Sequence, residues 1–551
     1  MSRPRIIQPT AHTAAGIILA LLVVMTSYSA ALAQPPTPGA VEESLRPRPT
    51  QPEKEMCLPE VQPPSPPRPT PPADQRRVRI DHVTVTGNTI FSEEELHIII
   101  ADQEGRELTL TDIYGLADRL TDFYQAHGYS LTTVTVPAQR MLKGVLRLEV
   151  VEGKVGKLVF EGNQRYENAL LTRHLDRLKP GTILRFADLE GEVLLLNDLP
   201  GLLARSVLVP GEAYGTTDIN LRMEEKKMAA SAVLDNQGRK VVGHWRVGTD
   251  FTINNPFKLG DLLSFGYTHT QHNLLRQGRF SYGFPVLPNG SRMNLNYSRA
   301  EYDVGGEFSV LNIAGTSETA RIQISHPFIR SRKTNLSATI AVAHVRGQSD
   351  MQDIPISGDT INFLETGLNY SYRNGSGGLT NLSGQLATNF RSNSDGSSDA
   401  LPPRLELHGD YEHLFGHNWS ALLRGEAVLT TDPMPDSNKY SIGGPASVRG
   451  FVSSQQRGDR GFMGSLEIRR GIAFTHADLL LKGFIDAGEV HSEIVQAGGS
   501  RSASLAAAGI GMTIIFADKY NLDLQWAKPI DGNDPGDNYD APIWATFTAT
   551  Y

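Results

Sequence analysis

Apolar and polar residues alternate in short segments from about Met228 to the end of the chain, and the spacing typical of helices is absent there. In Leu522–Trp526 the two leucines and the tryptophan fall on one face, and the polar residues fall on the other. A period of two residues predicts β-strands with one apolar and one polar face. Sixteen such segments can be counted, and they start near Ala229, Trp245, Asp261, Arg276, Ser291, Thr316, Lys333, Asp359, Gly378, Arg404, Asn418, Arg460, His476, Ser502, Tyr520 and Ala541.

An even number of strands of roughly ten residues, each with one apolar face, is typical of an outer-membrane β-barrel. Closure pairs every strand edge, which a lipid environment requires. A soluble β-sandwich is the alternative, because it also has alternating strands but packs two apolar faces together. The last residues favour the barrel, since they alternate up to an aromatic C-terminus. We interpret this end, which includes Phe547 and Tyr551, as the signal that outer-membrane assembly machinery reads.

Two copies of a smaller module precede the strands. The segments Val78–Gly87 and Lys157–Gly162 are both strand-like, and each is followed by asparagine, so the two Gly-Asn pairs lie 75 residues apart. A domain-sized spacing of this kind indicates an internal repeat. We therefore predict two α+β modules, at residues 77–153 and 154–227, each with the order β-α-α-β-β.

Helical signals support this order in both copies. Ser92 followed by three glutamates resembles a capped helix start, and Glu167–Leu178 has leucines at helical spacing. A longer apolar stripe runs from Ile113 to Tyr124, and His127-Gly128 ends that helix. The closing strands are expected at Leu131–Val136, Val145–Val151, Leu203–Val209 and Thr217–Met223. A three-stranded sheet covered by helices on one face keeps an open edge, which can accept an extended chain as an added strand.

One long connection interrupts the strand-like region. Residues 432–464 have no sustained apolar period, although alternating segments flank them. Connections of this length are usually functional or disordered. The tip Val448-Arg449-Gly450-Phe451 lies between glycine-rich arms, so its backbone can fold tightly and place one cation. We interpret the segment as a loop that enters the barrel, with a solvated surface loop as the alternative.

The parity of two strands predicts which side chains face the lumen. In Leu479–Gly488 the outward positions are apolar, which directs Lys482, Phe484 and Asp486 inward. The strand after the long loop likewise places Glu467 and Arg469 inside. Asp486 is therefore a possible partner for the guanidinium of Arg449, with two parallel hydrogen bonds as the best geometry. The alternative is that these charged side chains only line a water-filled lumen and form no specific contact.

Bulk properties exclude several classes of protein. The 551 residues exceed one ordinary domain, and the net charge of −8 argues against nucleic acid as a partner. Cys57 is the only cysteine, which rules out an intrachain disulfide and a cysteine-based zinc site. A mean hydropathy of −0.26 argues against a helical membrane protein but not against a membrane barrel.

The sequence lacks the common catalytic motifs. The sequence has no P-loop, H-E-x-x-H, G-x-S-x-G or C-x-x-C, and its 15 histidines have no ligand spacing on one helix face. The carboxylates form no recognisable acid and base pair. We therefore predict a protein that is not an enzyme and that has no metal site and no cofactor.

The N-terminus predicts export from the cytoplasm. Residues 1–33 have a basic start, a short apolar run and the A-x-A site Ala31-Leu32-Ala33, as in a secretory signal peptide. Residues 34–76 form a proline-rich tether, because 14 of the 33 prolines lie between Pro35 and Pro72. Such a segment is extended and semi-rigid. It is interpreted as a spacer, with a polyproline ligand as the alternative.

Several motifs resemble those of one family. Val448–Phe451 resembles the VRG[YF] loop motif of the two-partner secretion transporters (TpsB), and Gly483–Gly488, which contains Phe484, Asp486 and Gly488, resembles their F-x-D-x-G strand motif. Asn236–Gly243 and Asn255–Asp261 also look like that family's pattern. The resemblance extends from Val78 to Tyr551 and points to the ShlB/FhaC/HecB type of the POTRA–barrel superfamily.

The resemblance implies a fold and a function. Two periplasmic POTRA modules would precede a 16-stranded antiparallel barrel, at residues 228–551, in the outer membrane of a Gram-negative bacterium. The modules would capture an unfolded TpsA-like exoprotein, which crosses the barrel outward, while Arg449 pairs with Asp486 and stabilises the conducting architecture. Outer-membrane lipid and the barrel-assembly machinery are further expected partners. Many members plug the pore with an N-terminal helix, for which the proline density of residues 34–76 leaves little room.

Two other functions remain open at this point. An assembly factor that inserts other barrels shares the architecture, although such proteins generally carry more POTRA copies or different companions. A passive porin is disfavoured, because a diffusion pore needs no capture modules.

Overall fold

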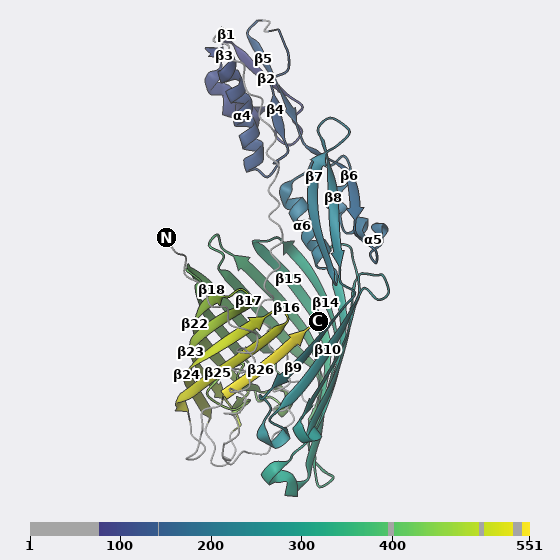
Figure 1. Cartoon of the computed structure of the whole chain (residues 1–551), viewed down its shortest axis with the longest axis vertical. Coiled ribbons are helices and arrows are strands. Elements are labelled where there is room, and N and C mark those ends of the chain that lie inside the picture. The colour runs from purple at the N-terminus through teal and green to yellow at the C-terminus, as the bar shows by residue number, and fades with distance from the viewer. Residues whose placement is uncertain (1–75, 141–142, 395–401, 495–500, 533–542) are drawn as a thin grey trace, which may run out of the picture.

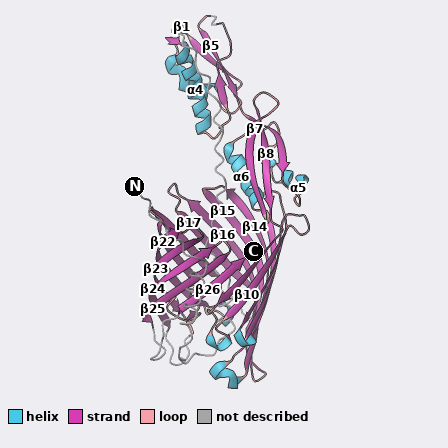
Figure 2. Cartoon of the chain, viewed as in Figure 1, coloured by secondary structure: helices cyan, strands magenta, loops and turns pink. Residues whose placement is uncertain are grey.

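The computed structural model describes residues 76–140, 143–394, 402–494, 501–532 and 543–551. Two small mixed modules stand one beyond the other on the same side of a large barrel (Figure 1). Helices are concentrated in the modules, and strands make up the barrel wall (Figure 2). The predicted signal peptide at 1–33 and all but the last residue of the predicted tether at 34–76 lie outside the described residues. The structure therefore does not test those two predictions.

The first module has the predicted three-stranded sheet and two helices, with an additional small sheet. The three-stranded sheet has the order β2-β5-β4, with β2 parallel to β5, and β1 pairs separately with β3. Its elements, with η marking a short 3₁₀ helix, are β1 (Arg77–Ile80), β2 (His82–Thr86), α3 (Glu93–Ile100), η1 (Ala101–Gln103), β3 (Arg106–Thr109), α4 (Leu110–Ala126), β4 (Thr133–Thr135) and β5 (Val145–Val151).

The extra sheet corrects the prediction of one strand from Val78 to Gly87. A break at Asp81 divides that segment into β1 and β2. Ile80 and Val83 are both buried, yet an uninterrupted strand would direct them to opposite faces. The break lets both side chains enter the same core. Ser92 caps α3 through a reciprocal capping box with Glu95, as the sequence predicts.

The second module repeats the three-stranded sheet, here in the order β6-β8-β7. Its elements are β6 (Lys154–Glu161), α5 (Asn168–Arg173), η2 (Asp176–Leu178), α6 (Phe186–Asn197), β7 (Leu202–Pro210) and β8 (Thr216–Glu225). The helix predicted over Glu167–Leu178 is wrong in its second half, because Leu175 leaves the helical conformation. Leu171, Leu175 and Leu178 nevertheless share one core, so their spacing reports burial rather than a continuous helix.

The region after the modules is a closed antiparallel barrel of sixteen strands within the described residues, which confirms the predicted fold class and rejects the sandwich. The strands pair in chain order, and β26 closes the barrel against β9. Their bounds are β9 (Met228–Asp235), β10 (Arg246–Asn254), β11 (Leu262–Thr270), β12 (Leu275–Pro285), β13 (Arg292–Asp303), β14 (Ile313–Arg330), β15 (Thr334–Met351), β16 (Ile354–Arg373), β17 (Leu379–Ser394), β18 (Arg404–Gly416), β19 (Trp419–Leu429), β22 (Arg460–Ala473), β23 (Ala477–His491), β24 (Ser502–Phe516), β25 (Tyr520–Gly532) and β26 (Ile543–Thr550).

The wall has the expected two faces. Leu466 and Ile468 on β22 and Ile485 on β23 are exposed on the outside, whereas Glu467 and Lys482 are buried inside. An apolar outer face with a polar interior is the arrangement that a barrel needs in lipid. Among the helices that the structure describes, none has the length and apolar character required to cross a bilayer.

The second module rests on the barrel through α6 and the residues directly after it. Leu195 lies over Gly290 and Leu199 over Gly260, both in short turns at the module end of the barrel. At the end of β14, the Nη2 and Nε atoms of Arg330 donate to the two carboxylate oxygens of Asp198 at 2.7 and 2.9 Å. Apolar contacts and ion pairs therefore hold this module in place, since Glu190 of α6 also lies 3.4 Å from Nε of Arg332.

Candidate functional site

The connection between β19 and β22 is an ordered hairpin inside the barrel. It contains η6 (Asp436–Asn438) and the paired strands β20 (Tyr440–Ile442) and β21 (Gln456–Gly458). Two glycines with positive φ, Gly443 and Gly444, turn the chain after β20, a conformation that other residues rarely adopt. The segment 432–464 therefore contains paired strands, although its sequence has no sustained apolar period. Its last five residues belong to β22, which begins at Arg460.

The tip of this loop is buried. Val448, Arg449 and Phe451 are each less than a tenth exposed, which argues against the solvated surface loop. Gly450 lies so close to the wall that a Cβ atom there would approach the Cβ of Ala507 on β24 to 2.6 Å. Glycine is therefore required by this contact, because any side chain would push the tip off the wall.

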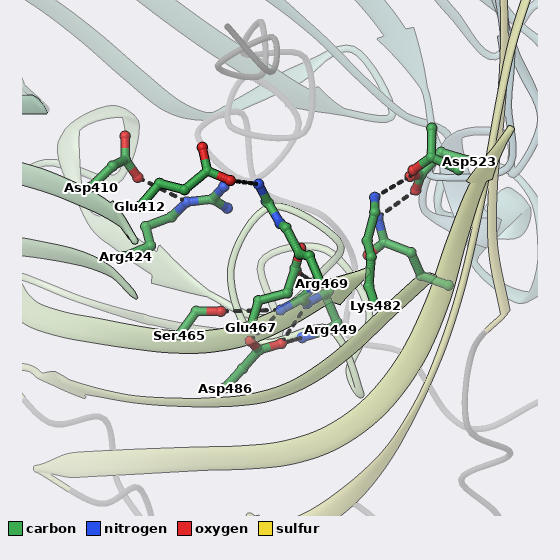
Figure 3. A network of polar contacts seen from close by, with 12 residues as sticks. Asp410, Glu412, Arg424, Arg449, Ser465, Glu467, Arg469, Lys482, Asp486 and Asp523 are labelled. Carbon is green, nitrogen blue, oxygen red and sulfur yellow. Dashed lines mark hydrogen bonds and ion pairs between the residues drawn. The ribbon is translucent and has the colours of Figure 1, made fainter. Parts of the chain in front are cut away.

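Arg449 is held by the side chains that sequence parity directs inward. Its Nε and Nη2 atoms donate to Oδ2 and Oδ1 of Asp486, both at 2.7 Å, and its backbone N–H donates to Oδ2 at 3.1 Å (Figure 3). Nη1 donates to Oε2 of Glu467 at 2.7 Å, and Nη2 also donates to Oγ of Ser465 at 3.1 Å. Both carboxylates thus bind the same guanidinium.

Two aromatic residues complete the site. The guanidinium carbon of Arg449 lies 3.3 Å from the centroid of the Phe484 ring, a cation–π contact. The indole Nε1 of Trp544 on β26 donates to the backbone oxygen of Arg449 at 2.7 Å. The tip is therefore bonded to β22, β23 and β26, including one strand of the closing pair.

Burial makes these contacts interdependent. The Asp486 side chain is 0% exposed, and those of Arg449 and Glu467 are 7% and 6% exposed. A buried charge needs a partner and further hydrogen bonds, because it has lost its hydration. Arg469 supplies a second cation, since its Nε donates to Oε1 of Glu467 at 2.6 Å. We call Arg449, Ser465, Glu467, Phe484 and Asp486 the lumen lock.

The other predicted residues lie outside the lumen lock. Lys482 pairs with Asp523 at 2.5 Å in a separate cluster (Figure 3). Gly488 lies beside the hairpin, where an added Cβ would meet Ile442 at 3.3 Å. Phe547 and Tyr551 are exposed on the outer face, and both pack on the ring of Tyr520.

Sequence reasoning missed Ser465 and Trp544. Both have inward parity in strands whose outward residues were identified, so parity was the available signal. The segment after β9 was recognised but not assigned a role. There the Asn236 side chain donates to the backbone oxygen of Ile543 at 2.7 Å and accepts from the N–H of Ala545 at 2.8 Å. It thereby joins the two ends of the barrel.

The turn between β10 and β11 was likewise recognised without a role. Its Asn255 exchanges hydrogen bonds with Arg165 of the second module: the arginine Nη2 donates to the Asn255 backbone oxygen at 3.0 Å, and Asn255 Nδ2 donates to the Arg165 oxygen at 3.2 Å. Asp261 accepts the N–H groups of Phe257 and Leu259 and shapes the turn. This motif therefore serves module docking.

Comparison with known proteins now assigns the family. The sequence profile of the haemolysin secretion/activation proteins ShlB/FhaC/HecB matches residues 215–514, and that of the ShlB-type POTRA domain matches residues 78–153. This chain belongs to the ShlB/FhaC/HecB family. Members of the family are two-partner secretion transporters, so the protein is an outer-membrane barrel with its POTRA modules in the periplasm.

Individual relatives agree with this assignment. The heme/hemopexin transporter protein HuxB of Haemophilus influenzae is 24% identical over 462 residues, covering 80% of this chain and 81% of HuxB. The hemolysin transporter protein HpmB of Proteus mirabilis is 25% identical over 474 residues, covering 82% and 81%. The solved structure of CdiB from Escherichia coli has a TM-score of 0.74 at 17% identity and covers 100% of both chains, which shows a shared fold.

Proposed function

We propose that this chain exports one large exoprotein, which its POTRA modules capture in an unfolded state in the periplasm. Relatives are named as transporters of haemolysin and of heme/hemopexin, which supports a secreted protein as the cargo class. Export involves no enzymatic step by this chain, and folding of the partner outside the cell provides the driving force for its translocation.

Capture takes place at a free sheet edge. The edge strands of the two three-stranded sheets are β2 and β4 in the first module, and β6 and β7 in the second. An extended segment of the partner adds to one of them through main-chain hydrogen bonds, which recognise an unfolded chain with little regard to sequence. The strand β4 is the least suitable, because it has only three residues.

The lumen lock keeps the inward loop in the position that export requires. The observation that carries this proposal is the desolvated bidentate contact between Arg449 and Asp486, because it fixes the loop tip to the inner wall at a defined place. Glu467 and Trp544 extend the contact to the neighbouring strand and to the closing strand. The exposed aromatic residues Phe547 and Tyr551 serve recognition by the barrel-assembly machinery.

Replacement of the locking residues tests this role. We expect Arg449→Ala and Asp486→Ala to reduce the secreted partner in the culture medium while the barrel remains in the outer membrane. A matched control is Arg424→Ala, because Arg424 also pairs in the lumen, with Asp410 at 3.2 Å, but outside the lumen lock. Normal secretion by both lock variants would refute the role of the lock and leave the family assignment intact.

Depletion distinguishes export from barrel assembly. If the chain is an exporter, its depletion removes one secreted protein from the medium and leaves the other outer-membrane barrels at normal levels. A general loss of barrels would instead identify an assembly factor.

A further inference from the structure

We infer that the first POTRA module carries a binding site for a divalent transition metal, formed by His82, His97 and Glu104. Each residue offers one ligand atom, and the three atoms all lie within 4.8 Å of one another. In the described part of the chain, this is the one group of three or more histidine, cysteine or acidic side chains with such spacing. The site lies in the module farther from the barrel and is separate from the lumen lock (Figure 1).

The distances suit a small cation. Nδ1 of His82 lies 2.8 Å from Oε1 of Glu104, and Nε2 of His97 lies 3.2 Å from the same oxygen. Zinc binds nitrogen and oxygen ligands at about 2.0–2.2 Å, so ligand atoms around one ion are roughly 3–3.5 Å apart. The two nitrogen–oxygen distances are close to this value, and the two histidine nitrogens lie within 4.8 Å of each other, so rotation of the side chains is what would bring all three ligand atoms around one ion.

Hydrogen bonds alone account poorly for this convergence. Oε1 of Glu104 already accepts the backbone N–H of Val83 at 2.7 Å. If both imidazoles also donated to it, one oxygen would accept three hydrogen bonds, although a carboxylate oxygen has about two lone-pair positions. A cation that accepts the lone pairs of both imidazoles removes the conflict and leaves Val83 to orient the carboxylate.

The ligands stand on elements with defined positions. His82 is the first residue of β2, His97 lies in the last turn of α3, and Glu104 directly follows η1. Both β2 and α3 are anchored, the first by pairing with β5 and the second by its capping box. Ligands on regular elements are held more precisely than ligands on loops, which reduces the entropic cost of binding.

The donor set indicates the class of metal. Imidazole nitrogen suits zinc, copper and nickel, whereas calcium and magnesium prefer oxygen ligands only. Three protein ligands leave positions for water, in keeping with side chains that are 55%, 35% and 21% exposed for His82, His97 and Glu104. We therefore assign an open, solvent-accessible site of the zinc type. The sequence predicts no metal site, because its ligands are scattered over three elements.

Binding would stabilise the first module in particular. The ion connects edge strand β2 to α3 and to the turn that leads into β3, so separation of these segments would break a metal bond. A ligand that binds only the folded state raises stability in proportion to the logarithm of its concentration over Kd. The cluster lies in the first module and Arg449 in the barrel, and no hydrogen bond or ion pair among the described residues joins them, so metal binding and the lumen lock are expected to be independent.

Calorimetry with zinc ion alone tests the site. The full mature chain is purified in detergent without a polyhistidine tag, in a Cys57→Ser background so that its one thiol cannot contribute. We expect one zinc ion per chain, and zinc affinity at least about tenfold weaker in His97→Asn and Glu104→Gln. Even the loss of a residue that only hydrogen-bonds to a metal ligand lowers metal affinity by about tenfold or more, so the loss of a ligand should cost at least as much. The matched control, His476→Asn, removes an exposed histidine in a barrel turn and should leave binding unchanged.

Hydrogen exchange locates the effect and guards against misfolded variants. Zinc should slow exchange in residues 82–104 of the parent chain, leave the second module unchanged, and have no effect in His97→Asn. Equal exchange of the two chains without zinc will show that the variant folds. Absence of zinc binding by the parent chain, or undiminished binding by both ligand variants, would overturn the proposal.

Discussion

Two arginine–aspartate pairs attach different parts of this protein to the barrel with nearly the same geometry. Arg449 attaches the inward loop, with Nε and Nη2 both 2.7 Å from the oxygens of Asp486. Arg330 attaches the second module, with the same two atoms at 2.9 and 2.7 Å from the oxygens of Asp198. By distance alone the two pairs are equivalent.

Their burial is different. The Arg449 and Asp486 side chains are 7% and 0% exposed, whereas those of Arg330 and Asp198 are 29% and 37% exposed. Water stabilises the separated charges of the second pair and screens their attraction, so that pair contributes little. Removing Arg449 from the first pair would leave the buried carboxylate of Asp486 without water and without its counter-charge. Burial, rather than the number of hydrogen bonds, thus decides how much stability is lost when one partner of a pair is removed.

Glu192 on α6 is buried like the first pair, but its cationic partner is more distant. Its side chain is 5% exposed, but its nearest cation, Nε of Arg177, lies 3.7 Å away, and its Oε2 has no hydrogen-bond partner within the described residues. Burial raises the pKa of this carboxyl to about 7, and the cation of Arg177 offsets only part of the shift. This buried carboxylate, which has a poor partner, therefore takes up a proton at a higher pH than an exposed glutamate does.

The largest expected effect is that of Arg449→Met. The change keeps an apolar stem but leaves Asp486 buried without its cation, which costs about 3–5 kcal/mol. We expect a lower unfolding temperature of the purified barrel and faster tryptic cleavage of the loop. The double variant Arg449→Met, Asp486→Leu should recover part of the loss, since it removes the unpaired charge. A single variant as stable as the parent chain would show that burial does not set the importance of this pair.

The second prediction concerns the pH dependence of the second module. The pKa of Glu192 is about 7 in the folded module and about 4.5 in the unfolded chain, so the folded state binds more protons between these values. Its stabilising effect is complete below about pH 4.5 and is lost as the pH rises to about 7, a decrease of about 3 kcal/mol. Hydrogen exchange of α6 between pH 5 and 8 measures this loss.

The variant Glu192→Gln should remove that pH dependence, because its amide does not titrate. Glu212→Gln is the control, since Glu212 lies in the same module with a side chain that is 81% exposed. If hydrogen exchange of α6 depends on pH in the same way in the parent chain and in Glu192→Gln, then burial of this carboxylate without a close partner does not destabilise the module.

The smallest expected effect is that of Arg330→Ala. An exposed ion pair contributes about 0.2–1 kcal/mol, and the contacts of Leu195 and Leu199 with the barrel turns remain. We expect the second module to stay docked, with only slightly faster hydrogen exchange in α6, and a difference from the parent chain that shrinks at high salt. Release of the module by this one substitution would show that the exposed pair matters as much as the buried one.

Much of the wall could be predicted because its pattern is local. Strand starts were predicted to within five residues, the largest difference being Asp359 against the observed start of β16 at Ile354. The inward positions of Lys482, Phe484 and Asp486 followed from the apolar residues between them. A period of two depends on neighbouring residues only, so the chain displays it before it folds.

Predictions that a strand or helix continues without interruption were less accurate. The strand is interrupted at Asp81 and the helix at Leu175, and each interruption lets the neighbouring apolar side chains reach a core. The spacing of apolar residues alone does not distinguish such an interrupted element from a continuous one. The hairpin β20–β21 was missed because its two three-residue strands are too short to display a period. The contact of Arg449 with Asp486 was anticipated from parity together with family resemblance.

By itself, then, the sequence determined the two modules, the number and faces of the strands, and the loop that carries Arg449. Only the tertiary structure decided which charges lose their water, that Ser465 joins the lumen lock and Trp544 bonds to its arginine, that Asp198 meets Arg330, and that His82, His97 and Glu104 converge. The physical reason is that local patterns depend on residues a few positions apart. Burial and ligand geometry depend on residues that are distant in the chain and adjacent only after folding.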